Sequence, residues 1–442
     1  MLFNRKQLLL LLVALALTLC IRVLTLQFMR AHLNDPGWFQ VGSYAKFDRQ
    51  ARAILNGEQR IFWIDDATRT DLAQYPPAFP AWVALIYKFS SDQSMYGVQI
   101  LQWFIDLILS FVLVTGIAWT AFGWRAGIAA SFLLSLSPLF ALYGAYPSAD
   151  APTTWFVLGG CWLLLLAAQR SNVWLALGAG VSLGIACWFR VNPLYLCAGW
   201  AFALFVFTRA PRRQRLLMSA AVLFGTVLVI APIVVRNYLV FPDFTPTGGT
   251  IGVNLWEGLG ETELGRQNGF ILGDDKMLAQ ERVKLSLPAD AQLQWPDGIR
   301  RDRERAREAL DFIKQHPIWY AGVMLGRMWG MLKVAGDPVP YTGTSGINVT
   351  SPKCLPPNRQ GGVLALVVNV LGMIQSVVRY LFLPLTAFGL WLGMRSDWRV
   401  CCILLVTILY YLVPGTAAHT EIRYVLPMHG LLTVFAGCVF KR

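Results

Sequence analysis

Charged residues and histidines are scarce in this sequence of 442 residues. Asp, Glu, Lys and Arg make up 14% of it and there are only 4 histidines, whereas a soluble protein of this length carries about 25% charged residues. In their place 56% of the residues are hydrophobic, and apolar runs of about 20 residues, the length that crosses a bilayer as a helix, recur along the chain. These runs are continuous rather than alternating, which favours helices over a barrel. The sequence predicts an all-α, polytopic membrane protein with about ten transmembrane helices, within a range of roughly nine to thirteen.

Paired cysteines and clustered metal ligands are also missing. No two cysteines are spaced as CxxC, and all of them except Cys354 lie in apolar runs, where cysteine behaves as a small hydrophobic residue. The sequence therefore predicts no disulfide framework. It also demands no cofactor, although the isolated His316 and His419 leave a divalent metal open.

Basic stripes of the kind that bind nucleic acid are absent as well, despite a net charge of +13. The basic residues gather in short loops between apolar runs, as the orientation of membrane proteins requires. No such stripe, interleaved with aromatic residues, marks a soluble domain. We therefore expect membrane lipids among the partners and no nucleic acid.

The basic residues also fix an orientation. Arg5 and Lys6 precede the first apolar run, which is long for a signal peptide and is interpreted as an uncleaved helix that starts in the cytoplasm. Every short loop that follows on the cytoplasmic side carries Arg or Lys, whereas the outer loop 144–152 carries neither. Both termini are then expected in the cytoplasm.

Three regions follow from this topology. Residues 1–238 form an N-terminal transmembrane module with a catalytic first external loop at 28–96, residues 239–362 form a long external loop with juxtamembrane helices, and residues 363–442 form C-terminal transmembrane helices. Amphipathic periodicity predicts a surface helix over 43–56 in the first of these loops.

Acids and arginines accumulate at the outer ends of the spans. Carboxylates suit proton abstraction from an acceptor, and the guanidinium group pairs two oxygens of a phosphate and stays charged. A group transfer from a phospholipid carrier would need both. The residues of this kind that we single out are Asp48, Asp65, Asp66, Asp150, Arg190, Arg236, Glu421 and Arg423.

Six stretches spread over most of the chain carry a resemblance to a known family. They are YAKFDRQARAILNG at 44–57, YPPAFPAWVALIY at 75–87, SPLFALYGAYPSADAP at 137–152, GIACWFRVNP at 184–193, APIVVRNYLVFPDFTPTGGTIGVNLWEG at 231–258 and EIRYVLP at 421–427. With them the chain resembles a bacterial member of the glycosyltransferase C superfamily. It is similar to the polyprenyl-phosphate-sugar-dependent branch, which is related to protein O-mannosyltransferases and the lipid A aminoarabinose transferase.

The resemblance implies two catalytic carboxylates. One lies in the first external loop, where Asp48 is the nearest match and Asp65 and Asp66 are alternatives, and the second is Asp150 at the start of the fourth span. Each has a plain structural alternative, because Asp48 may be a solvated position on a surface helix and an acid at a helix start, such as Asp150, is a favourable cap.

The resemblance also implies basic residues that bind the lipid phosphate. Arg236 and Arg423 match best, followed by Arg190, and Glu421 and Tyr75 are counted with them as substrate-binding residues. The alternative for Arg190 and Arg236 is that they end helices and reach for lipid headgroups. Tyr75 starts a Tyr-Pro-Pro turn that brings the loop back to the membrane.

These expectations combine into an inverting glycosyltransferase. It would move a hexosyl or pentosyl group from a polyprenyl-phosphate carrier to a lipid, protein or glycan acceptor on the periplasmic face of a bacterial inner membrane. Three alternatives stay open: a polymerase or ligase of lipid-linked oligosaccharides, a transporter of lipid or glycan, and a non-catalytic membrane subunit.

Overall fold

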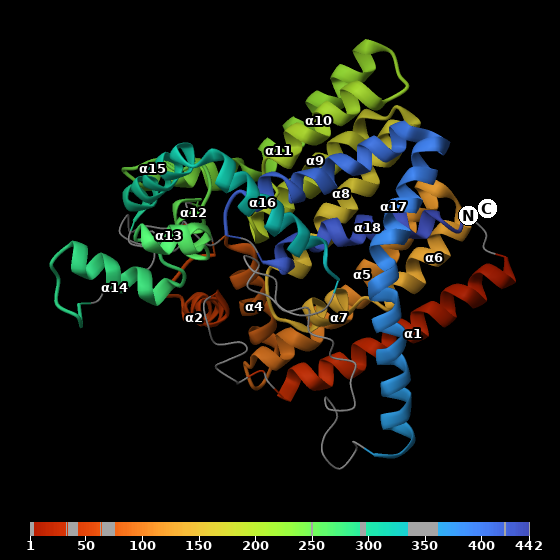
Figure 1. Ribbon diagram of the computed structural model, residues 1–442, viewed down its shortest axis with the longest axis horizontal. Coiled ribbons are helices and arrows are strands. Elements are labelled where there is room, and N and C mark those ends of the chain that lie inside the picture. The colour runs from red at the N-terminus through yellow and green to blue at the C-terminus, as the bar shows by residue number, and fades with distance from the viewer. Residues whose placement is uncertain are drawn as a thin grey trace.

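A computed structural model describes residues 4–31, 33, 43–61, 63, 76–248, 251–291, 298–334, 361–419 and 421–441. Every regular element within these ranges is helical, which confirms the all-α fold (Figure 1). In chain order the helices are α1 (Arg5–Ala31), α2 (Ser43–Leu55), α4 (Ala78–Phe89), α5 (Met95–Phe122), α6 (Trp124–Ser135), α7 (Pro138–Ala145), α8 (Asp150–Arg170), α9 (Val173–Phe189), α10 (Leu196–Phe207), α11 (Arg212–Val240), α12 (Ile251–Gly260), α13 (Glu263–Gln267), α14 (Asp274–Lys284), α15 (Ile299–Gln315), α16 (Pro317–Leu332), α17 (Gly362–Leu412), η3 (Pro414–Thr416), η4 (Ile422–Val425) and α18 (Leu426–Cys438).

The chain has the helices of a multi-pass membrane protein. Among the described residues, five helices are long and apolar enough to cross a membrane, namely α1, α5, α8, α11 and α17. The pair α6 and α7 makes a sixth span if its two members, bent by 62°, are counted together. Four further apolar helices are shorter, and the total of about ten spans stays a prediction.

Small residues set how closely the spans pack. An ideal Cβ on Gly180 of α9 would lie 2.1 Å from the backbone oxygen of Val222 on α11, and one on Gly225 of α11 would lie 2.7 Å from the oxygen of Leu177 on α9. The backbones of the two helices are therefore in contact. Close approach of this kind is how helices associate in lipid, where dispersion and hydrogen bonds replace the hydrophobic effect.

α18 lies at the centre of the bundle. All of its residues are buried, and it packs against α5, α6, α8 and α17. Gly389 of α17 and Gly437 of α18 make this possible, because a Cβ at either position would clash with a backbone oxygen of a neighbouring helix.

Two residues of α17 would be expected to interrupt a membrane helix, because Arg379 is charged and Pro384 has no N–H to donate. Instead α17 stays helical through both positions, and its break lies at Asp397, where the backbone leaves the helical region (φ −148, ψ 92). The Asp397 carboxylate accepts the N–H groups of Arg399 and Val400 at 3.1 and 3.4 Å. It thereby caps the second limb of α17, which runs back toward α18.

A buried ion pair joins α1 to α5 inside the membrane. The guanidinium of Arg22 bonds directly to the carboxylate of Asp106, and both side chains are 2% exposed. Arg22 also donates to Ser110 at 2.7 Å, and Trp155 of α8 donates to Asp106 at 2.6 Å. Gly144 of α7 lies against this pair, since a Cβ there would come within 2.5 Å of Asp106. The pair thus fixes α1, α5, α7 and α8 together.

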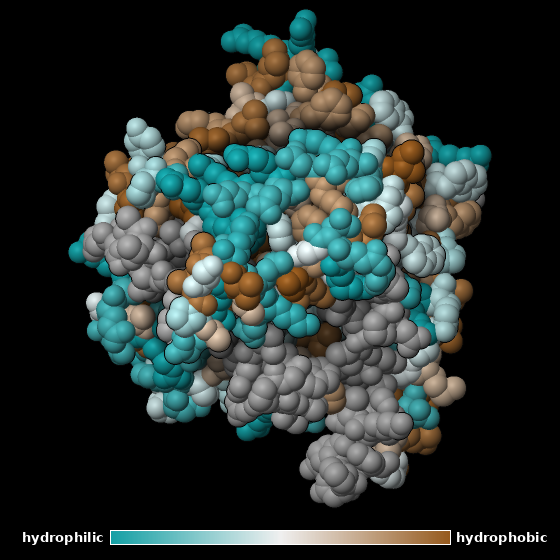
Figure 2. All heavy atoms as spheres, turned by 60° about the vertical axis from the view of Figure 1, so that its left-hand side comes forward, coloured by the Kyte–Doolittle hydropathy of each residue, from teal (hydrophilic) through white to brown (hydrophobic). Residues whose placement is uncertain are grey.

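The segments outside the spans gather at one end of the bundle. Helices α12 to α15 lie there, on the far side of the bundle from the start of α1 and the end of α18 (Figure 1). Asp302 of α15 accepts the N–H groups of Gly252 and Val253 at 3.2 and 2.9 Å, and so caps the start of α12. Seen from this end, hydrophilic residues cover much of the surface (Figure 2).

The helices α2 and α4 belong to the same end. Phe47 of α2 meets Phe79 of α4 edge to face, with ring centroids 4.9 Å apart. Both rings belong to one apolar cluster with Ala149, the residue before α8. The predicted surface helix over 43–56 is therefore present, and Gly57 ends it with a φ of 75°.

Candidate active site

Asp150 opens α8 and is buried. Its Oδ1 lies 2.6 Å from Nε of Arg190, and its Oδ2 lies 4.0 Å from Nε of Arg423. The hydroxyl of Ser148 donates to Oδ2 at 2.9 Å. The structure thus brings together three of the residues that the sequence placed on the outer face. Because its carboxylate is enclosed, Asp150 is better placed to orient the two guanidinium groups than to meet a substrate.

Side chains of α5 form hydrogen bonds with the turn that precedes Asp150. The side-chain amide of Gln99 donates to the carbonyl of Ala145 at 3.0 Å, and that of Gln102 donates to the carbonyl of Tyr146 at 2.5 Å. Both glutamines are fully buried. They satisfy carbonyls that the end of α7 leaves without a helical partner.

The connection from α17 to α18 adds the next charges. Arg423 lies 2.7 Å from Glu421, and Glu421 lies 3.7 Å from Nε2 of His419. The other ring nitrogen of His419 is 2.5 Å from Glu261, which follows α12. Through Glu421 and His419, Arg423 therefore connects Asp150 to Glu261 at the end of α12.

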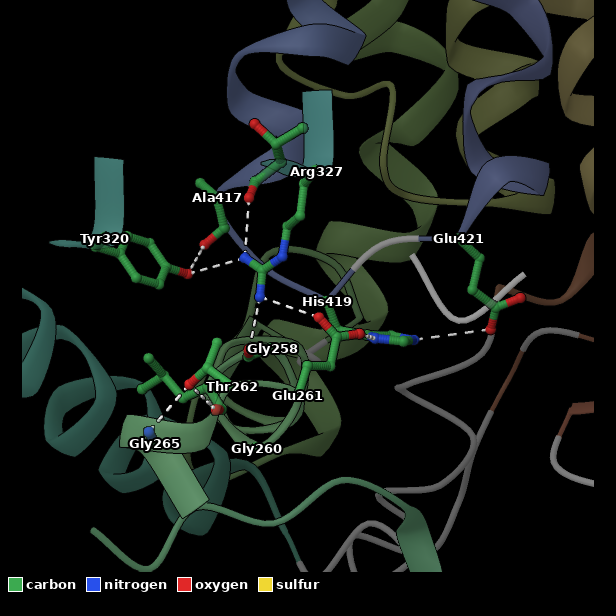
Figure 3. Close-up of polar contacts among 12 residues, drawn as sticks. Gly258, Gly260, Glu261, Thr262, Gly265, Tyr320, Arg327, Ala417, His419 and Glu421 are labelled. Atoms are coloured by element: carbon green, nitrogen blue, oxygen red, sulfur yellow. Dashed lines mark hydrogen bonds and ion pairs between the residues drawn. The ribbon is translucent and has the colours of Figure 1, made fainter. Parts of the chain in front are cut away.

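Arg327 of α16 ends this row of charges and is fully buried. It pairs with Glu261 at 3.1 Å and donates to the carbonyls of Gly258 and Thr416 at 2.5 and 3.0 Å (Figure 3). The hydroxyl of Tyr320 lies 3.2 Å from the same guanidinium. One arginine thus fastens α12, α16 and the end of α17 to one another.

Glu421 and His419 are held in the ionised state by their charged neighbours. Burial alone would raise the pKa of Glu421, but Arg423 and His419 outweigh it and lower that pKa to about 2. Burial alone would lower the pKa of His419, but its contacts with Glu261 and Glu421 raise it to about 11. Both groups are therefore charged throughout the physiological range.

The row has more positive than negative charge. The cations are Arg190, Arg423, protonated His419 and Arg327, and the carboxylates between them are Asp150, Glu421 and Glu261. One positive charge is left over. A surplus of this size, at the end of a bundle of apolar helices, complements a singly charged phosphodiester.

Asp48 lies apart from this row, on α2. Its Oδ1 accepts a hydrogen bond of 2.6 Å from the hydroxyl of Tyr87, and its Oδ2 accepts one of 3.1 Å from Arg52. Its side chain is 28% exposed. Within the described residues its contacts are with α2 and α4. Asp48 directly follows Phe47 in the chain, and Asp150 directly follows Ala149. Phe47 and Ala149 belong to the same apolar cluster. Asp48 is the accessible acid of the two.

Glu257 on α12 faces the same region. Burial raises its pKa to about 7, while His419 lowers it and Asp274 raises it. Its carboxylate accepts the N–H of Gly273 at 3.2 Å. Asp274 in turn lies 4.0 Å from Lys46 of α2, which links the first external loop to the long one.

Glu257→Gln is expected to remove a pH dependence near neutrality. The wild-type carboxyl is neutral below a pKa of about 7 and gains a negative charge above it. That charge opposes the binding of an anion at the neighbouring row by on the order of 1 kcal/mol, or about fivefold. The dissociation constant of an anionic ligand of this row should therefore rise between pH 6 and 8 in the wild type, as measured in binding titrations at fixed ionic strength. A profile that rises equally in Glu257→Gln would contradict this assignment.

The remaining predicted residues have different outcomes. Arg236 is buried near the end of α11 and donates to the side-chain oxygen of Asn237 at 2.9 Å. Asn237 donates to the carbonyl of Thr245 at 2.9 Å. Tyr75, Asp65 and Asp66 lie outside the described residues.

Sequence reasoning missed several polar residues that the structure brings to this region. Glu261 and Arg327 carry no local pattern that distinguishes them from other charges of the long loop. A signal did exist in α5, because its buried polar residues recur every three or four positions on one helix face. They are Gln99, Gln102, Asp106 and Ser110.

The two histidines considered as metal ligands have other neighbours. His419 lies between Glu261 and Glu421, and His316 lies against the ring of Phe312, with centroids 4.8 Å apart. Among the residues that the structure describes, no three His, Cys, Asp or Glu side chains are grouped to hold a metal ion.

Comparison with known proteins gives one family. Residues 74–238 match the family described as dolichyl-phosphate-mannose-protein mannosyltransferase, and this match confirms the resemblance to the glycosyltransferase C superfamily over that stretch. No curated protein matches the chain.

Two similar solved structures are both of the Archaeoglobus fulgidus oligosaccharyltransferase. The apo form is 13% identical with a TM-score of 0.48, over 96% of this chain and 50% of that one. The complex with Zn and sulfate is 15% identical with a TM-score of 0.48, over 97% and 48%. This chain thus spans about half the length of the proteins in those structures.

Proposed function

We propose that this protein is an integral membrane glycosyltransferase that moves a sugar from a polyprenyl-phosphate carrier to an acceptor, with inversion at the anomeric carbon. The observation that carries the proposal is the row of buried ion pairs from Arg190 to Arg327, with its one surplus positive charge. The match of residues 74–238 to a mannosyltransferase family supports it. The reaction takes place at the periplasmic face of a bacterial inner membrane, with both termini of the chain in the cytoplasm.

The cations act on the leaving group. As the bond between the anomeric carbon and the phosphate oxygen breaks, the electron pair stays on the phosphate and its negative charge grows. Arg423, oriented by Asp150 and Glu421, is placed to stabilise that charge, with Arg190 beside it. Fixed donors that meet a developing charge in a site shielded from water are the strongest single contribution to many enzymatic rates. Arg236 is a further phosphate ligand in this proposal.

Asp48 acts on the acceptor. It takes the proton of the acceptor hydroxyl or amine as that atom attacks the anomeric carbon, and the carrier leaves as polyprenyl phosphate. One displacement inverts the configuration. The hydrogen bond from Tyr87 and the ion pair with Arg52 hold the carboxylate in one orientation.

A transporter of lipid or glycan is the second candidate. The buried pair Arg22 and Asp106, beside the break between α6 and α7, is a feature that transporters also have at the middle of the membrane. The two candidates differ in product, because only a transferase releases free polyprenyl phosphate.

Arg423→Gln tests the proposal directly. We expect it to lower kcat/KM for a polyprenyl-phosphate sugar by about 100- to 1,000-fold, because it removes the surplus charge that meets the leaving phosphate. The assay measures free polyprenyl phosphate released in proteoliposomes from a panel of single-sugar donors. Arg266→Gln is the control, since Arg266 is an exposed arginine of the same external segment. A wild-type protein that moves such lipids across the membrane without releasing polyprenyl phosphate would favour the transporter.

A further inference from the structure

A pocket of about 630 Å³ lies between the end of the first limb of α17 and the residues that follow α18. It is at the opposite end of the bundle from the candidate active site. α18 runs from the charged row to this pocket, and the start of α1 is on the same side (Figure 1). Beside the pocket, α17 and α18 are in close contact at Gly389, where a Cβ would clash with the carbonyl of Phe435 and touch Val439 of the pocket lining.

Two cations line the pocket. The central carbon of the Arg395 guanidinium lies over the ring of Trp391, 3.9 Å from its centroid. The ammonium of Lys441 donates to the carbonyl of Leu392 at 3.0 Å. The contact with the ring positions the guanidinium, whose N–H groups can pair with two phosphate oxygens. An ammonium carries three donors, so two remain on Lys441.

The acid nearest to them in sequence is engaged elsewhere. Asp397 accepts two backbone N–H groups of the second limb of α17 and lies 3.4 Å from Arg209. Within the described turns at this end it is the one carboxylate, whereas each of these turns carries Arg or Lys. In the described part of the chain no carboxylate lies within ion-pair distance of Arg395 or Lys441. The two charges therefore favour an anion.

The other walls are those of a lipid site. Phe388 and Trp391 stack on each other with centroids 5.4 Å apart and face outward from the bundle, 50% and 45% exposed. Leu392 and Val439 complete the apolar lining. Phe388 precedes Arg395 by about two helical turns, or roughly 10 Å along the axis. In a phospholipid, a similar distance separates the phosphate from the upper part of the acyl chains.

We propose that this pocket binds the phosphodiester headgroup of an anionic phospholipid, with Arg395 and Lys441 on the phosphate and Phe388 and Trp391 along the acyl chains. Basic pockets between transmembrane helices recognise lipid headgroups in this way. A soluble phosphate compound would use the same cations and would gain nothing from the exposed aromatic wall. The site is separate from the charged row and does not depend on the proposed transferase activity.

Lipid retention by the full-length protein tests the inference. The purified protein is incubated with equal amounts of phosphatidylglycerol and phosphatidylcholine, and native mass spectrometry counts each bound lipid. We expect the wild type to retain phosphatidylglycerol at least tenfold better, and the pair Arg395→Gln/Lys441→Gln to reduce that preference to less than threefold. The matched control is Arg125→Gln/Arg399→Gln, which removes the same charge at the same end. Each of these arginines also lies over a tryptophan ring, as Arg395 does.

Three results would overturn the inference. The first is a pocket variant that keeps the wild-type preference. The second is a control variant that loses the preference equally, which would indicate only a general attraction to a basic surface. The third is displacement of the bound lipid by millimolar glycerol 1-phosphate as effectively as by added phosphatidylglycerol, which would identify a soluble ligand. Trp391→Leu keeps both charges and removes the stacking surface, and we expect about a threefold loss of retention. It gives a second readout if the double variant is not monodisperse.

Discussion

Asp48→Asn is expected to reduce sugar transfer about 1,000-fold while the protein folds normally. An amide has the shape of the carboxylate and still accepts from Tyr87 at Oδ1, but it does not take up a proton at neutral pH. General base catalysis contributes roughly 100- to 10,000-fold. Asp48 is the accessible acid of the two candidates, because its side chain is 28% exposed whereas that of Asp150 is 1% exposed. The loss should therefore appear in kcat, with the KM for the donor changed little.

The matched control is Glu58→Gln, an exposed acid beyond the end of α2 that accepts a hydrogen bond from Asn56. It should transfer sugar at the wild-type rate. Expression level and a single peak in size-exclusion chromatography show whether each variant is folded. If Asp48→Asn turns over normally, the base is another acid, and Asp65 and Asp66 in the same segment are tested next.

Arg22→Met is expected to give the largest loss of stability. It leaves Asp106 buried with Trp155 as its remaining strong donor and without its cation. Removing one partner of a buried ion pair costs about 3–5 kcal/mol, because the other charge stays away from water. Gly144 of α7 lies against this pair. The variant should therefore also disturb the segment that leads from α7 to Asp150. Thermal unfolding in detergent, followed by size-exclusion chromatography, measures the shift.

The double variant Arg22→Met/Asp106→Asn separates charge from shape. It removes both charges, and its amide oxygen still accepts from Trp155, so most of the lost stability should return. An Arg22→Met protein as stable as the wild type would show that the pair contributes nothing. A double variant as unstable as Arg22→Met would show that side-chain packing, and not the uncompensated charge, causes the loss.

The sequence predicted which residues lie on the same face as the site better than it predicted which side chains are in contact there. Charge placement alone assigned Asp150, Arg190 and Arg423 to one face, and the structure joins them through one carboxylate. The predicted topology assigns each of these residues to one side of the membrane. Because all three are close to helix ends on that side, they are expected to lie close together. The contacts of Glu261 and Arg327 depend instead on how α12 and α16 fold over the bundle. No periodicity in the long loop encodes that arrangement.

The helices α2 and α4 show when a sequence pattern is enough to predict a helix and when it is not. The amphipathic pattern predicted α2 because one apolar face repeats with the helical period. α4 was taken for a loop with a rigid turn, since its prolines mark a bend. In the structure Pro77 precedes its first turn and Pro80 lies in that turn, where a proline has no helical N–H to lose. The same residue type thus favours a turn or a helix start, and the apolar residues that follow decide between them.

The central place of α18 also bears on how the chain assembles during synthesis. α5, α6 and α8 emerge from the ribosome long before α18, yet in the folded protein all three pack against it. Until α18 inserts, these three helices lack the contacts that they make with it. Asp150 and Arg190 are made early, whereas Arg423 arrives only with η4. The charged row is therefore completed by one late insertion event, and a chain arrested before residue 423 has no such row to offer a substrate.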